Sequence, residues 1–230
     1  MSFYHGGLSL KIIGGPGSSE LASKIGKLTS WPMVSVNTKR FPDGEFYFRL
    51  EEKVSGEDLL IVQSLYPPQD SRLVELFFIL DTVRAFKAKT VKVFIPYLAY
   101  SRQDERYLEG ECLSASLMAE LLQYLGVDAL YTIDAHNKKV LNMYKIPAYT
   151  LTASGELAKY FISKDLKDPF VVAPDDEEMA LKRAETAAKT LGAEYDFFEK
   201  SRNRHTGDIV TYSKNVDVKG KDAIIIDDII

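Results

Sequence analysis

The feature that most constrains the fold of this chain is a regular alternation of short apolar runs with helix-length amphipathic stretches. Runs such as 59–63, 91–95 and 129–133 have the length of β-strands, whereas 70–86 repeats its apolar residues at intervals of three and four. Strands that alternate with helices form a mainly parallel sheet with helices on both faces. We therefore expect an α/β protein.

The same pattern starts again after residues 145–147, and 230 residues are enough for two modest cores. We expect an N-terminal domain over residues 1–147 and a C-terminal domain over residues 148–230. Residues 45–50 differ from the buried strands, because polar and apolar residues alternate there and Phe46, Phe48 and Leu50 fall on one face. This pattern indicates a hairpin arm in the first domain.

Composition excludes several classes of protein. Hydrophobic residues make up 46% and charged residues 27%, which is a globular balance. A net charge of −4 disfavours a nucleic-acid partner, yet a few arginines with Mg²⁺ can still neutralise a nucleotide. The most apolar run, 74–80, is about a third of a membrane span, and no signal-peptide pattern opens the chain. With Cys112 as the single cysteine, we expect a soluble, cytoplasmic protein.

Ligands of parallel sheets bind at the carboxyl ends of the strands, so polar segments that follow strands are the candidate sites. Residues 40–45 instead open the hairpin arm, and their Pro-Asp-Gly is also ordinary turn chemistry. The functional alternative is a rigid loop that offers the Phe41 ring to a base, with Asp43 and Glu45 as hydrogen-bond acceptors.

Two further segments in the first half follow strands directly. Arg102 and Arg106 stand four apart, which fits a solvated helix face, but Arg102 can equally give a bidentate contact to phosphate. His136 follows the strand at 129–133. A lone histidine is commonly structural; alternatively it binds Mg²⁺, with Asp134 two residues earlier orienting its ring.

The second half contributes three polar segments. Four acidic residues at 175–178 exceed what the helix dipole explains, so one of them is expected to face a metal. Residues 200–205 form either a solvated basic loop or a lid that brings positive charge to a transferred phosphoryl group. The apolar run at 223–226 ends in Asp227 and Asp228, a costly arrangement unless the carboxylates serve a ligand such as sugar hydroxyls.

Together and in this order, the motifs resemble those of the ribose-phosphate diphosphokinases. The most specific are Arg-Phe-Pro-Asp-Gly-Glu at 40–45, Tyr-Ser-Arg-Gln-Asp at 100–104 and Ile-Ile-Ile-Asp-Asp-Ile-Ile at 224–230. The resemblance runs from about residue 10 to residue 230. It implies two phosphoribosyltransferase-like domains, a homo-oligomer, and transfer of the diphosphoryl group of ATP to the C1 hydroxyl of ribose 5-phosphate with Mg²⁺.

The resemblance also implies a role for individual residues. The residues implied to bind ATP are Phe41, Asp43, Gly44, Glu45, Arg102, Gln103 and Asp104. The implied Mg²⁺ ligands are His136 and Asp175. The implied catalytic pair is Lys200 and Arg202, and ribose 5-phosphate is expected to contact Arg202, Asp227 and Asp228.

The chain departs from the family pattern in places, and two other functions stay open. Glu177 and Glu178 replace small residues of many relatives. Relatives continue past the Asp-Asp-Ile-Ile motif with a turn that binds the 5-phosphate, so we expect the second domain to be incomplete at its C-terminal end. A phosphoribosyltransferase shares the Asp-Asp motif but does not require segments 40–45 and 100–104. A non-catalytic regulatory paralogue would not need the implied metal and catalytic residues.

Overall fold

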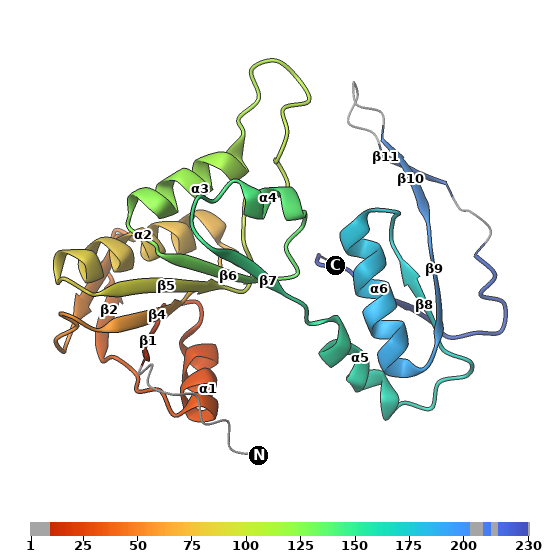
Figure 1. Cartoon of the computed structure of the whole chain (residues 1–230), viewed down its shortest axis with the longest axis horizontal. Helices are drawn as coiled ribbons and strands as arrows, with labels where there is room; N and C mark the ends of the chain where they lie inside the picture. The colour runs from red at the N-terminus through yellow and green to blue at the C-terminus, as the bar shows by residue number, and fades with distance from the viewer. Residues whose placement is uncertain (1–9, 203–208, 213–215, 230) are drawn as a thin grey trace. The chain divides into compact units, whose positions relative to one another are not determined.

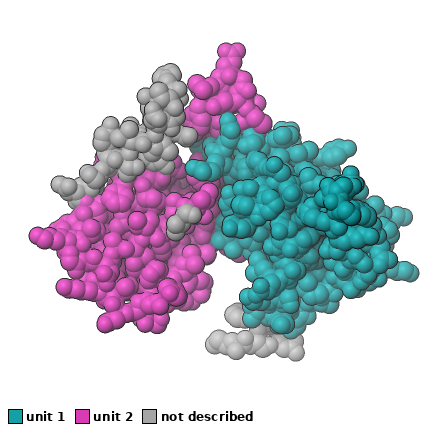
Figure 2. Space-filling model, turned by 180° about the vertical axis from the view of Figure 1, so that it is seen from behind, with its two compact units in different colours: residues 1–104, 114–133, 139–150 teal, residues 105–113, 134–138, 151–230 magenta. Residues whose placement is uncertain are grey.

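The computed structural model describes residues 10–202, 209–212 and 216–229, with the backbone alone for 200–202 and 209–212. The chain divides into two compact units (Figure 2). Unit 1 comprises residues 1–104, 114–133 and 139–150, and unit 2 comprises residues 105–113, 134–138 and 151–230. Unit 2 thus includes two short segments from the first part of the sequence, and the domain boundary expected after residue 147 stays a prediction.

Unit 1 is built on a five-stranded sheet in the order β1-β4-β5-β6-β7 (Figure 1). The strands are β1 (Leu10–Gly14), β4 (Asp58–Val62), β5 (Thr90–Ile95), β6 (Ala129–Ile133) and β7 (Ala148–Leu151). The first four pair in parallel, as the alternating sequence pattern predicts. Strand β7 was not expected, because its residues alternate between exposed and half-buried positions and lack a buried apolar run.

Alternate residues of these strands are buried on opposite faces of the sheet. Ile13 and Ile61 belong to the main core, which includes buried residues of α2 (Gln69–Ala85) and α3 (Ser114–Tyr124). Ile12 and Leu60 belong to a second cluster, which α1 (Ser19–Thr29) completes through Ala22. Each fully buried aliphatic side chain contributes roughly 1.5–3 kcal/mol. The short helix α4 (Lys138–Asn142) lies between β6 and β7 in the chain (Figure 1).

The hairpin arm of unit 1 is confirmed. Strands β2 (Val36–Arg40) and β3 (Phe46–Leu50) pair antiparallel as a separate two-stranded sheet. Phe48 and Leu50 pack against the main core, as their shared face predicts. Phe46 stacks on Phe78 of α2, with ring centroids 6.2 Å apart. The arm is therefore fixed to α2 by its apolar face.

Unit 2 contains a three-stranded parallel sheet in the order β12-β8-β9 (Figure 1). The strands are β8 (Phe170–Ala173), β9 (Glu194–Phe197) and β12 (Ala223–Ile225), with helices α5 (Ser154–Ile162) and α6 (Glu178–Leu191). The buried face of α6 carries small side chains at 180, 184 and 187, all alanine, which join Val171 and Ile224 in one cluster. Small residues let a helix approach its neighbours closely.

The basic segment at 200–205 differs from the loop that the sequence suggested. Strand β10 (Glu199–Arg202) pairs antiparallel with β11 (Ile209–Tyr212). Glu-Lys-Ser-Arg is a weak strand former by itself, but strand propensity depends on the partner. The partner strand β11, with the sequence Ile-Val-Thr-Tyr, has the high strand propensity that β10 lacks. Residues 203–205 lie outside the described residues. Within the described ranges, no helix is long and apolar enough to cross a membrane.

Candidate active site

A buried carboxylate, Glu75 of α2, lies beside the end of β2 that leads into the tip of the hairpin arm. Its side chain is only 1% exposed. Oε2 accepts hydrogen bonds from Arg72 Nη1 at 2.9 Å and Gln63 Nε2 at 3.2 Å, and Oε1 accepts one from Arg40 Nη2. A buried charge is tolerated only when it is paired and hydrogen-bonded. Glu75 meets that condition in part through its ion pair with Arg40, the last residue of β2.

Gln63 connects the hydrogen bonds of Glu75 to the turn that follows β1. Its Oε1 accepts the Gly17 N–H at 3.3 Å, and its Nε2 also donates to the Arg72 carbonyl at 3.3 Å. A Cβ atom at Gly15 would lie 2.0 Å from Gln63 Oε1, so only glycine permits this approach. Gln63 therefore fixes the turn between β1 and α1.

The loop at 41–45 is a closed turn at the tip of the arm. The Phe41 N–H donates to the Glu45 carbonyl and the Gly44 N–H to the Phe41 carbonyl, both at 2.9 Å. Gly44 has φ of +95°, which favours glycine. Arg40 Nη1 donates to the Gly44 carbonyl at 3.0 Å, so the network of Glu75 reaches the loop. The Phe41 ring is 40% exposed, and Asp43 and Glu45 are exposed as well.

A pocket of about 420 Å³ lies between the arm and α2. It is lined by Arg40, Gly44, Glu45, Phe46, Asp70, Ser71, Val74 and Phe78. Asp70 also accepts a hydrogen bond from the hydroxyl of Tyr100, two residues before the second predicted ATP segment at 102–104. Both predicted ATP segments thus border the first turns of α2.

Arg102, Gln103 and Asp104 lie in the loop after β5, at the carboxyl edge of the sheet. Arg102 is exposed, and the Gln103 carbonyl accepts the Ala115 N–H at 3.3 Å, which ties the loop to the start of α3. Among the described residues, no hydrogen bond or ring contact joins this loop to the 41–45 loop. Unit 1 thus places the two segments near one helix without a hydrogen bond between them among the described residues.

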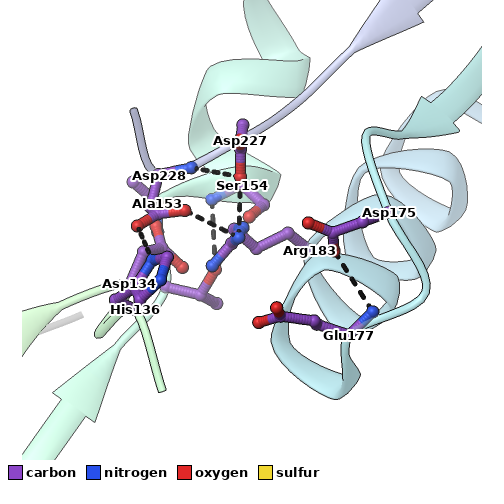
Figure 3. Close-up of polar contacts among 10 residues, drawn as sticks. Asp134, His136, Ala153, Ser154, Asp175, Glu177, Arg183, Asp227 and Asp228 are labelled. Carbon is purple, nitrogen blue, oxygen red and sulfur yellow. Dashed lines mark hydrogen bonds and ion pairs between the residues drawn. The ribbon is translucent and has the colours of Figure 1, made fainter. Parts of the chain in front are cut away.

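The acid pair predicted for a sugar follows β12 in unit 2 and is held by a buried arginine (Figure 3). Arg183 Nη2 donates to Asp227 Oδ1 at 2.7 Å and to Asp228 Oδ1 at 2.8 Å. The Asp228 N–H donates to Asp227 Oδ1 at 2.9 Å. Arg183 is 5% exposed, whereas Asp228 and Asp227 are 11% and 26% exposed. The carboxylates are held side by side at the strand end.

The two carboxyls of this pair ionise differently. Burial raises the pKa of Asp227 above its ordinary value, and the adjacent Asp228 adds to the effect. Burial would also raise the pKa of Asp228, but hydrogen bonds with His136 and Asp227 and the charge of Arg183 outweigh it. The pKa of Asp228 therefore lies below its ordinary value. Asp228 is the more firmly ionised member of the pair.

The His136 ring contacts a carboxylate of this acid pair, Asp228. Its Nδ1 is 3.0 Å from Asp228 Oδ2 (Figure 3). Asp134, expected to orient the ring, instead accepts the Ala153 N–H at 2.9 Å through Oδ2. The expectation about Asp134 was wrong because the left-handed backbone at Asp134, with φ of 42°, directs its carboxylate to the start of α5. A carboxylate on one ring nitrogen is the usual support of a metal-binding histidine.

Asp175, the other predicted metal ligand, follows β8 and precedes α6. Its Oδ1 accepts the Glu177 N–H at 3.1 Å, so part of its role is to shape the helix start (Figure 3). No group of three or more candidate ligands converges among the described residues. Mg²⁺ usually takes one or two protein carboxylates together with substrate phosphates and water. The donors in unit 2 fit that mode of binding better than a preformed cage.

The predicted catalytic pair lies on β10. Lys200 is paired with Thr211 and Arg202 with Ile209 in the register of β10 and β11. The two positions are two residues apart, and alternate positions of a strand share a face. A paired strand holds their backbone more firmly than the open loop expected from the sequence.

Two residues of these sites were missed in the sequence, although each left a signal. Arg183 interrupts an otherwise small apolar face of α6, three residues after Ala180 and four before Ala187. Glu75 similarly stands among the buried apolar positions of α2, next to Leu76. A charged residue at a core position of an amphipathic helix requires a buried partner. The sequence pattern did not reveal which residues would pair with Arg183 and Glu75.

The fold and the strand-end groups define a class: an α/β protein with mainly parallel sheets flanked by helices and polar groups gathered at the strand ends. Residues 10–126 match the family model described as the N-terminal domain of ribose phosphate pyrophosphokinase. The chain is 41% identical to the ribose-phosphate pyrophosphokinase of Sulfurisphaera tokodaii over 95% of its length and 75% of that protein. It is also 41% identical to that of Pyrococcus furiosus, covering 94% and 74%.

A solved structure agrees. The phosphoribosylpyrophosphate synthetase from Mycobacterium smegmatis matches with a TM-score of 0.79 and 28% identity, over 96% of this chain and 71% of that one. This chain belongs to the ribose-phosphate pyrophosphokinase family.

Proposed function

We propose that this protein transfers the diphosphoryl group of ATP to the C1 hydroxyl of ribose 5-phosphate, giving phosphoribosyl diphosphate and AMP. The observation that best supports this reaction is the acid pair of unit 2. Asp227 and Asp228 stand at a strand end, 2.7 and 2.8 Å from one buried guanidinium nitrogen. Adjacent carboxylates in fixed positions are good acceptors for the hydroxyls of a sugar.

In this reaction the C1 oxygen forms a bond to the β-phosphorus while the bond from that phosphorus to the α,β-bridging oxygen breaks. The C1 hydroxyl loses its proton, and AMP leaves with the bridging oxygen. Catalysis of this kind consists mostly of alignment and charge stabilisation. Lys200 and Arg202 supply positive charge to the transferred group, and Arg202 also serves the sugar side.

The ATP side of the proposal rests on unit 1. Phe41 offers an exposed ring for the adenine, and Asp43, Gly44 and Glu45 offer acceptors on a loop that three hydrogen bonds close. Arg102, exposed after β5, contacts the phosphates, and its neighbours Gln103 and Asp104 complete that segment. A rigid loop loses little conformational entropy when it binds its ligand.

We further propose that His136 and Asp175 hold Mg²⁺ together with the substrate phosphates. When bound, the ion neutralises phosphate charge and orients the phosphate oxygens. Asp228 keeps the His136 ring in place through the 3.0 Å contact with Nδ1. Asp175 lies at the start of α6 with one oxygen on the Glu177 N–H, so its position is fixed before any ligand arrives.

The proposed reaction is tested by incubating the protein with ATP, Mg²⁺ and ribose 5-phosphate and measuring AMP and phosphoribosyl diphosphate. We expect equal amounts of both products and no ADP. Asp227→Asn is the informative variant, because it keeps the size of the side chain while weakening its acceptors. Formation of ADP would show γ-phosphoryl transfer instead, and AMP without a phosphorylated sugar product would show hydrolysis. Either result would contradict the proposal.

We also propose that the protein acts as a homo-oligomer whose assembly completes the ATP site. No hydrogen bond or ring contact joins the 41–45 loop to the 102–104 segment among the described residues, so the two can be joined between subunits. We expect sedimentation to show a dimer or larger species. Mixing inactive Asp43→Ala with inactive Arg102→Ala should restore activity, because some mixed interfaces then contain two intact segments. A fully active monomer, or no recovery in mixed oligomers, would contradict the shared site.

The expected cytoplasmic location and the expected lack of a nucleic-acid partner stay predictions. They depend on the net charge of −4 and the single cysteine. Neither property bears on the residues assigned above.

A further inference from the structure

Arg183 is a buried arginine at a position where packing alone favours a small residue. The face of α6 that it shares is made of alanines, and Ala180, Ala184 and Ala187 are each no more than 2% exposed. A guanidinium in such surroundings is unfavourable unless its charge is compensated. The carboxylates of Asp227 and Asp228, which follow β12, compensate the charge of Arg183.

One nitrogen makes both contacts. Nη2 bridges Asp227 Oδ1 and Asp228 Oδ1, while Arg183 Nε and Nη1 are buried without a hydrogen-bond partner in the described part of the chain. An arginine selected for stability would use more of its donors, because unpaired buried donors are unfavourable. The arrangement instead orients two adjacent carboxylates whose like charges would otherwise drive them apart.

The contacts also determine which oxygen of the pair is available. Asp228 uses Oδ1 for Arg183 and Oδ2 for His136. Asp227 uses Oδ1 both for Arg183 and for the Asp228 N–H, so Arg183 and the backbone N–H contact the same oxygen of Asp227. The side chain of Asp227 is the more exposed of the two. Asp227 Oδ2 is therefore the oxygen of the pair that neither Arg183 nor His136 contacts.

We propose that Arg183 is a positioning residue for the sugar: by bridging Asp227 and Asp228 it fixes the outer oxygen of Asp227 for a ribose hydroxyl without touching the substrate. This inference rests on the proposed function, since it assigns the acid pair to ribose 5-phosphate. It adds a residue from the middle of α6 to a site otherwise built from strand-end loops. Its consequence is selective, because the contacts that we assign to ATP in unit 1 involve no residue of α6.

The test uses the full-length enzyme and three single variants. Arg183→Gln removes the charge, and Arg183→Lys keeps the charge but loses the planar fork. Lys189→Gln is the matched control: it removes an exposed cation from the same helix, where Lys189 pairs with Glu185. For each protein the KM for ribose 5-phosphate is measured at saturating ATP, and the KM for ATP at saturating ribose 5-phosphate. Calorimetry measures the Kd for ribose 5-phosphate independently of turnover.

We expect Arg183→Gln to raise the KM and Kd for ribose 5-phosphate about tenfold or more, because charge-assisted hydrogen bonds are lost. Arg183→Lys should raise the KM and Kd for ribose 5-phosphate about threefold, because an ammonium group keeps the positive charge but lacks the planar donor geometry of a guanidinium. In both variants the KM for ATP should stay within about twofold, and Lys189→Gln should change neither constant, as for exposed pairs.

Two further measurements distinguish a variant that fails to fold from one that folds but binds ribose 5-phosphate poorly. Near-ultraviolet circular dichroism and the unfolding midpoint show whether each variant is folded; if Arg183→Gln is not, Arg183→Lys decides the outcome. A folded variant of Arg183 with the wild-type KM for ribose 5-phosphate would overturn the inference, as would equal rises in both KM values. Failure of the wild-type enzyme to form AMP from the two substrates would instead refute the proposed function.

Discussion

Replacing Lys200 or Arg202 by alanine is expected to lower kcat on the order of 10²-fold each, by analogy with the removal of one preorganised charge donor. The KM for ATP should change far less. The reason is that positive charge at the transferred group is worth most when charge accumulates in the transition state. Both residues lie on β10, two positions apart, so the two losses should not simply add.

Steady-state kinetics with each single variant and the double variant check this expectation. Lys27→Ala is a suitable control, since Lys27 is an exposed cation on α1. It should leave kcat unchanged. A rise in KM with kcat intact would show that β10 provides a binding surface only, and the catalytic assignment would then be wrong.

Glu75→Ala is expected to lower the free energy of unfolding by about 3 kcal/mol, the lower end of the range for removing one partner of a buried ion pair. The lower end applies because Arg72 and Arg40 are 25% and 45% exposed and can turn to water. Gln63, which is fully buried, loses its acceptor and cannot be rescued in that way. The loss should appear as a lower midpoint in urea unfolding.

The same variant should also raise the KM for ATP. Arg40 bonds both Glu75 and the Gly44 carbonyl, so loss of the carboxylate frees the loop that carries Phe41 and Glu45. Glu20→Ala serves as the control, because Glu20 pairs with Lys24 on an exposed face of α1 and should not affect stability or kinetics. A stability loss under about 1 kcal/mol would show that the network around Glu75 is dispensable.

Much of unit 1 followed from local pattern. The apolar runs of β4, β5 and β6 and the threefold and fourfold spacing in α2 predicted their elements, because these periodicities depend on neighbouring residues alone. The hairpin arm was likewise predicted from the alternation of Phe46, Phe48 and Leu50. The elements that were not predicted include the short helix α4 and the strands β7 and β10. The residues of β7 and β10 carry weak strand signals, and each strand forms because it pairs with another strand.

The candidate site divides in the same way. The sequence by itself determined which polar groups follow strands, and therefore that His136, Asp175, Asp227 and Asp228 lie at sheet edges. Only the tertiary structure decided which of them meet. His136 contacts a carboxylate 92 residues away rather than its neighbour Asp134, and Arg183 reaches acids 44 and 45 residues ahead. The physical reason is that periodicity records which face of an element is buried, whereas the partner of a buried charge is determined by sheet order and packing between elements far apart in the chain.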